Sequence, residues 1–87
     1  MNLDEARQII NSVDSEMAKL FEKRMTAVFE VAKYKKENNL PVYDPAREKV
    51  VIEKNSGYIE NPEFVEYYKK WIQYTMDLSK EYQKTKI

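Results

Sequence analysis

Residues 3–38 read LDEARQIINSVDSEMAKLFEKRMTAVFEVAKYKKEN and contain no glycine or proline. Apolar residues recur along this stretch at intervals of three or four, with one interval of eight. They are Leu3, Ala6, Ile10, Val13, Met17, Leu20, Val28 and Val31. Because this spacing places them on one side of an α-helix, we predict a single helix from about Leu3 to Asn38, with these residues as its apolar stripe.

The predicted helix is long for the size of the chain. It would extend about 54 Å at a rise of about 1.5 Å per residue, whereas a compact chain of 87 residues is only about 25 Å across. We therefore expect the helix to project beyond its own domain and to leave part of the apolar stripe uncovered. A second copy of the chain is the expected cover.

Three basic residues lie on or near the apolar side of this helix. Arg24 lies four residues after Leu20 and Lys35 four after Val31, so both take positions where the pattern calls for an apolar residue. Arg7 lies about 100° around the helix from Arg24 and too far along it to share a pocket within one chain, although an antiparallel dimer could bring it to the partner's pocket. Unpaired buried cations are unstable, so inward-facing cations indicate an anionic ligand or internal carboxylates. Alternatively, their stems cover apolar surface while their charged groups reach water.

The composition excludes several classes of function. Fifteen basic residues balance fifteen acidic ones, which disfavours binding to nucleic acid or to anionic membranes. The chain has no histidine and no cysteine, which excludes thiol and imidazole catalysis, disulfides and the usual zinc sites. A metal site would have to consist of carboxylates alone.

The N-terminus reads MNLDEARQ and lacks the basic and apolar regions of a signal peptide, and no apolar run reaches the length of a membrane span. We therefore expect a cytoplasmic protein. The length predicts a single domain over residues 1–87, and one glycine among abundant helix-forming residues predicts an all-α fold.

Two further helices follow from cap and proline signals. Asp44-Pro45 predicts the start of a short helix that continues to about Lys54 and is closed by Asn55-Ser56-Gly57. Asn61-Pro62 predicts a third helix of medium length, ending near Lys84. We expect its packed face to contain Phe64, Tyr67, Tyr68, Trp71, Ile72, Thr75, Met76, Ser79 and Tyr82. Its aromatic residues, Tyr74 included, have the spacing of a helix-packing surface, and the zero net charge disfavours base stacking.

Several of these positions together match a known family pattern. They are Arg7, Arg24, Lys35, the segment LPVYDPARE at residues 40–48, the segment MDLS at residues 76–79, and Gln83. In this order and spacing, over about residues 5–84, the chain resembles the all-helical chorismate mutases.

The resemblance implies an intertwined homodimeric helical bundle with two active sites, each completed by Arg7 from the other subunit. It also implies an isomerase that rearranges chorismate to prephenate, in the shikimate pathway to Phe and Tyr, by a Claisen-type step that needs no cofactor and no metal. Because the chain ends soon after Gln83, we expect a monofunctional enzyme of the bacterial type.

The resemblance further implies a role for each matching residue. Arg24 and the partner's Arg7 would bind the substrate carboxylates, assisted by Arg47 and Ser79. Lys35 and Gln83 would donate hydrogen bonds to the ether oxygen as its bond breaks. Glu48, and Asp44 through its backbone, would hold the ring hydroxyl. The apolar lining would come from Val31, Val51 and Met76.

Two alternatives remain open at this point. The chain could be a non-enzymatic helical dimerisation module, in which the inward cations pair with Glu48, with Asp44 or with acidic residues of a partner. It could also be an isochorismate pyruvate lyase on the same scaffold, because one cationic pocket would serve both substrates.

Overall fold

Three α-helices and one short 3₁₀-helix make up the protein, whose computed structural model describes residues 1–87. The elements are α1 (Leu3–Glu37), α2 (Pro45–Ser56), η1 (Pro62–Phe64) and α3 (Val65–Lys84). The all-α prediction is confirmed, with a long, a short and a medium helix in that order. None of these helices is both long enough and apolar enough to cross a lipid bilayer.

Local sequence signals account for both ends of α1. The Asn2 side chain accepts a hydrogen bond from the Glu5 backbone N–H at 2.8 Å, which satisfies one of the free donors of the first turn. At the other end Asn38 is the C-cap and Asn39 has a φ of 54°, a left-handed conformation that asparagine tolerates. The predicted bounds of the long helix are therefore correct to within one residue.

The predicted bounds of the other two helices need correction. The Asp44 side chain caps α2 as expected, accepting from the Arg47 backbone N–H at 3.1 Å, but the helix continues through Ser56 instead of ending near Lys54. Asn61 also caps as expected, accepting from the Glu63 N–H at 3.0 Å. The turn that it begins is a 3₁₀ turn, closed by the Val65 N–H on the Pro62 carbonyl, so α3 begins only at Val65.

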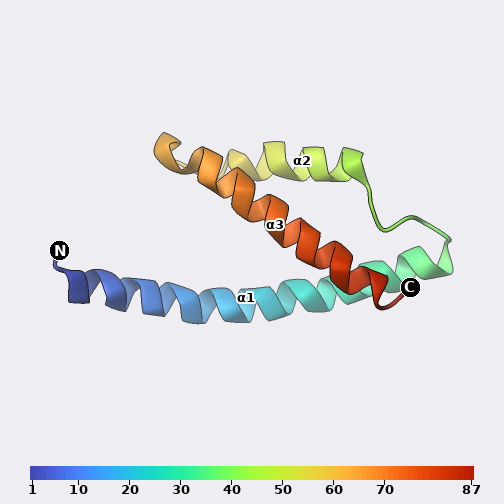
Figure 1. Ribbon diagram of the computed structural model, residues 1–87, viewed down its shortest axis with the longest axis horizontal. Coiled ribbons are helices and arrows are strands. Elements are labelled where there is room, and N and C mark those ends of the chain that lie inside the picture. The colour runs from blue at the N-terminus through green and yellow to red at the C-terminus, as the bar shows by residue number, and fades with distance from the viewer.

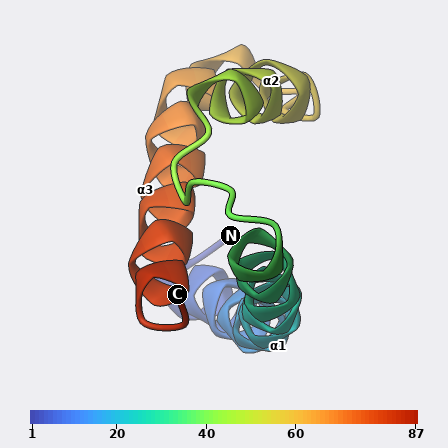
Figure 2. The ribbon, with the colours of Figure 1, turned by 90° about the vertical axis from the view of Figure 1, so that its right-hand side faces the viewer.

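Helix α3 holds the structure together because it packs against both other helices, whereas α1 and α2 do not pack against each other. Figure 1 shows α3 running obliquely from α2 to the C-terminal half of α1. In the end view of Figure 2, α1 and α2 lie at opposite ends of α3, and residues 38–44 span the distance between them. This loop therefore connects two helices that each contact α3 but not each other.

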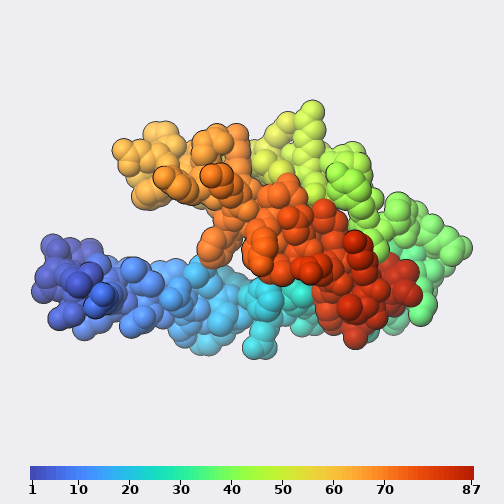
Figure 3. All heavy atoms as spheres, viewed as in Figure 1, coloured from blue at the N-terminus to red at the C-terminus, as the bar shows by residue number.

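The molecule is elongated, with extents of 53 × 25 × 15 Å and a radius of gyration of 15.8 Å. A compact chain of this length would have a radius of gyration of about 12 Å. In Figure 3 the first part of α1 stands clear of the remaining chain. The long helix therefore projects beyond the rest of the protein, as its length predicts.

Only a small core is buried within one chain. It consists of Val28, Ala32, Ile72, Met76, Ser79 and Gln83. Most of the apolar stripe of α1 is exposed, and so are Phe64, Tyr67 and Trp71 of the predicted packed face of α3. Their expected burial is not found within the chain, because α3 meets α1 only where the C-terminal halves of the two helices cross.

Candidate functional site

A cavity of about 200 Å³ lies between the C-terminal halves of α1 and α3, the loop before α2, and the first turns of α2. All the site residues predicted from the sequence line it, except Arg7. The lining residues are Arg24, Val28, Val31, Lys35, Val42, Asp44, Arg47, Glu48, Val51, Met76, Ser79, Lys80 and Gln83.

Arg24 is fixed against α3 by a chain of hydrogen bonds. Its guanidinium donates to the Ser79 hydroxyl, and that hydroxyl donates to the Thr75 backbone carbonyl at 2.9 Å. Burial lowers the pKa of Arg24, because partial removal from water disfavours the charged guanidinium. No carboxylate of the chain pairs with it. Arg24 is therefore a partly desolvated cation held in one orientation without an anionic partner.

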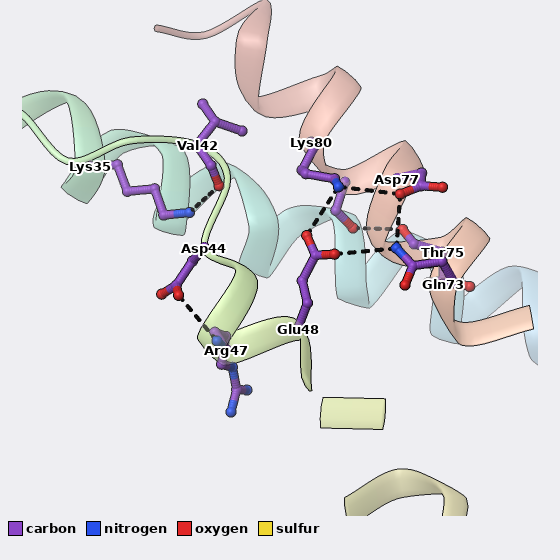
Figure 4. A network of polar contacts seen from close by, with 10 residues as sticks. Lys35, Val42, Asp44, Arg47, Glu48, Gln73, Thr75, Asp77 and Lys80 are labelled. Atoms are coloured by element: carbon purple, nitrogen blue, oxygen red, sulfur yellow. Dashed lines mark hydrogen bonds and ion pairs between the residues drawn. The ribbon is translucent and has the colours of Figure 1, made fainter. Parts of the chain in front are cut away.

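Lys35 lies about three turns beyond Arg24 on α1. It is also without a carboxylate partner. Its Nζ donates to the Val42 backbone carbonyl at 2.8 Å, across the turn that follows α1 (Figure 4). An ammonium group has three N–H donors, so this bond orients Lys35 and leaves two donors for a ligand. The same bond ties the loop to the wall of the cavity.

Gln83 closes the cavity from the last turns of α3. Its residue exposure is only 6%, and its Oε1 is buried without a hydrogen-bond partner. A buried amide oxygen is satisfied only by a hydrogen-bond donor, such as water or a donor on a ligand or on another chain. The amide N–H groups of the same side chain are the part of Gln83 that can donate to a ligand.

The beginning of α2 supplies two carboxylates and one cation. The Asp44 carboxylate caps the helix by accepting from the Arg47 backbone N–H, and Arg47 itself is exposed. Glu48 is engaged differently, because Lys80 and Gln73 donate to its two oxygens at 3.1 and 3.2 Å. Neither carboxylate therefore neutralises Arg24 or Lys35.

The side chains that line the cavity have a positive balance. Four are cationic and two are carboxylates, a net charge of +2, and apolar groups from all three helices complete the wall. Chemically, this arrangement suits a small organic dianion with an apolar body. No group of three His, Cys, Asp or Glu side chains is placed to hold a metal ion.

Arg7 stands apart from this site. It is exposed in the N-terminal half of α1 and does not line the cavity. The helix carries it about 26 Å from Arg24, at about 1.5 Å per residue over the intervening turns. Only another copy of the chain could bring Arg7 to this cavity.

The sequence did not point to three of the lining residues in this role, namely Val28, Val42 and Lys80. Val28 was predicted only as part of the apolar stripe. Lys80 follows Asp77 by three residues, a spacing that by itself indicates an ordinary surface pair on a helix. Nothing in the local pattern connects it to Glu48, which lies far away in the sequence.

Comparison with known proteins is consistent with this geometry. Residues 6–84 match the family model described as chorismate mutase type II. No curated protein matches the chain.

Proposed function

The chain belongs to the chorismate mutase type II family, and on that premise we propose that it is a chorismate mutase, an isomerase that converts chorismate to prephenate. The observation that carries this proposal is the cavity whose cations, Arg24 and Lys35, have no carboxylate partner. Chorismate is a dicarboxylate, and its charge of −2 complements the balance of the lining side chains.

Binding would hold the substrate folded, with its side chain over its ring. Arg24, already oriented by Ser79, would pair with one carboxylate, and the exposed Arg47 would assist at the mouth of the cavity. Because the rearrangement is intramolecular, fixing the two reacting ends near each other removes much of the entropic barrier. Val31, Val51 and Met76 would pack against the apolar body of the substrate.

The chemical step breaks a C–O bond and forms a C–C bond within one molecule, so it requires no nucleophile and no cofactor. Negative charge develops on the ether oxygen as its bond breaks. The two free N–H groups of Lys35 and the amide of the buried Gln83 would donate hydrogen bonds to that oxygen. Glu48, and Asp44 through its backbone, would hold the ring hydroxyl.

The proposal includes an intertwined homodimer in which each cavity receives Arg7 from the other subunit. Two observations support it: the exposed apolar stripe in the N-terminal half of α1, and the distance that separates Arg7 from the cavity of its own chain. A partner helix over the stripe would bury its apolar residues and add a further cation to the site. Buried apolar surface would then supply the core that one chain lacks.

The finer features expected from the sequence belong to the same proposal. They are a single domain over residues 1–87, a mutase of the bacterial type, and a cytoplasmic enzyme of the shikimate pathway to Phe and Tyr.

The test is a continuous absorbance assay of chorismate consumption by the purified protein, with identification of the product. Lys35→Ala should lower kcat/KM by about 100- to 1,000-fold, because it removes a donor aimed at the developing charge. Lys33→Ala is the matched control, since Lys33 is exposed on the same helix and does not line the cavity. Equal activity of the two variants would contradict the proposed role of Lys35.

The same assay separates the two alternatives. Pyruvate release from isochorismate, without conversion of chorismate, would identify a lyase that uses the same cavity. A dimerisation module would show no turnover, and its inward cations would be neutralised by acidic residues. Within the chain, Glu48 is instead paired with Lys80, and Asp44 caps α2. This observation favours the enzyme over the dimerisation module.

A further inference from the structure

Glu48 is held by both of its carboxylate oxygens. Lys80 Nζ lies 3.1 Å from Oε2, and Gln73 Nε2 donates to Oε1 at 3.2 Å (Figure 4). Both donors come from α3, whereas Glu48 is in the first turn of α2. The two bonds therefore hold a carboxylate of α2 from two side chains that lie about two turns apart on α3.

Lys80 is itself held in place from two other directions. Its Nζ lies 3.3 Å from Asp77 Oδ1 and 4.6 Å from the centre of the Tyr43 ring, which belongs to the loop before α2. Gln73 also donates to Asp77 Oδ1, at 3.1 Å. Glu48, Gln73, Asp77 and Lys80 thus form one network, called here the Glu48 network, in which the only cation is Lys80.

This network differs from an ordinary surface ion pair. The side chains of Lys80 and Glu48 are 22% and 15% exposed, whereas those of the pair Lys69–Glu66 on the same helix are 43% and 80% exposed. An exposed pair between flexible side chains contributes little to structure. A partly buried pair with a second donor on the carboxylate restricts where that carboxylate can lie.

We propose that Lys80 is a positioning residue, which holds the Glu48 carboxylate on the cavity wall in the orientation that accepts the ring hydroxyl of the substrate. The proposal rests on the function proposed above. Without Lys80, Glu48 would keep only the amide of Gln73 and would be free to turn toward Arg47 or Lys35, the cations needed by the substrate. A side chain that acts in this way affects the reacting geometry without touching the substrate.

The kinetic test compares Lys80→Met and Lys80→Arg with the control Lys69→Met. Lys80→Met keeps the apolar stem and should lower kcat by about 10- to 100-fold, with a smaller change in KM, because a misplaced group acts mainly on the reacting geometry. Lys80→Arg, which retains the charge, should recover most of this loss. Lys69→Met should leave both constants within about twofold of the unaltered protein.

A folded Lys80→Met protein with unchanged kcat would overturn the proposal. So would an Arg variant no better than the Met variant, because the charge would then be irrelevant. Circular dichroism and size-exclusion chromatography of each variant separate these results from a failure to fold. If Lys80→Met does not fold, Lys80→Gln, which keeps a polar donor, takes its place in the same comparison.

A second measurement does not depend on turnover. The hydrogen bond to Glu48, and then the one to Asp77, raise the pKa of Lys80. In protein with ¹³C-labelled lysine, the titration of the Lys80 ε-carbon should therefore move to lower pH in Glu48→Gln. An unchanged Lys80 titration would show that the contact is absent in solution and would overturn the proposal.

The two measurements distinguish this proposal from the proposed function. An unaltered protein that does not convert chorismate overturns both the mutase function and the positioning role, even if the Lys80 titration responds to Glu48→Gln. Normal turnover with an unresponsive titration overturns the positioning role alone.

Discussion

The two halves of α1 belong to one apolar stripe but have opposite surroundings. In the C-terminal half Val28 is 8% exposed and Ala32 is fully buried, because α3 crosses the helix there. In the N-terminal half Leu3 and Leu20 are both 62% exposed. Spacing therefore identifies which side of a helix is meant to be covered, but not which element covers it.

The same contrast applies to the cations of α1. Arg24 and Lys35, in the covered half, are oriented by hydrogen bonds and line the cavity. Arg7, in the uncovered half, is exposed and has no such contact. If a partner covers the N-terminal half, both halves of the helix serve active sites, each in a different subunit.

The largest expected effect comes from removing Arg7 in one chain and Arg24 in another, and then mixing the two variants. Arg7→Ala and Arg24→Ala should each lower kcat/KM by about 100-fold or more, since each removes a charged partner of a substrate carboxylate. Mixed dimers should contain one doubly altered site and one intact site. Unfolding and refolding an equal mixture should then restore about a quarter of normal activity, because half of the dimers are mixed and half of their sites are intact.

A refolded mixture as inactive as its components would show that Arg7 and Arg24 do not act in one shared site. Each variant refolded alone is the control for losses during the procedure.

A smaller effect is expected when a charge is placed on the uncovered side of α1. Leu20→Glu should break a dimer that buries this face, with a loss in the free energy of unfolding of about 3 kcal/mol or more, because an unpaired charge would be buried. Ser15→Glu makes the same charge change about 140° around the helix from Leu20 and should cost less than about 0.5 kcal/mol. Light scattering and denaturant unfolding measure both quantities.

Both positions are exposed in the isolated chain. A monomer would therefore tolerate both substitutions about equally, and equal behaviour of the two variants would contradict the dimer.

The smallest expected effect is on the pH dependence of stability and concerns Asp77, a residue of α3. The hydrogen bond from Gln73, followed by that from Lys80, lowers the pKa of Asp77 below its usual value of 3.8. Its stabilising contribution is therefore complete above the pKa that Asp77 has in the unfolded chain, and is lost as the pH falls through its lower pKa in the folded chain. Asp77→Asn should make stability less sensitive to pH below about pH 4.

Denaturant unfolding from pH 6 to pH 2.5 measures this change. Asp14→Asn, in the uncovered half of α1 and outside every salt bridge of the chain, is the control. If Asp14→Asn alters the acid dependence of stability and Asp77→Asn does not, the stabilising role assigned to the bonds of Asp77 is wrong.

Helix positions and most cavity residues could be predicted because they depend on local chemistry. Asn2, Asp44 and Asn61 cap helices within a few residues of themselves, and Arg24 and Lys35 follow from the phase of one helix. The 3₁₀ turn at Pro62–Phe64 was missed because a capped proline start suits both kinds of helix. Lys80 was missed because its partners, Glu48 and Tyr43, belong to other segments.

The sequence alone settled the fold class, the order of the helices and the set of groups available for chemistry. Periodicity and caps depend only on residues close together in the chain, and composition does not depend on position at all. Tertiary structure decided which half of the apolar stripe is covered. It also decided that Glu48 pairs with Lys80 and not with Arg24 or Lys35. The physical reason is that burial and ion pairing depend on distances between helices. The oblique crossing of α3 sets those distances, bringing Lys80 to Glu48 and leaving Arg24 and Lys35 without a carboxylate partner.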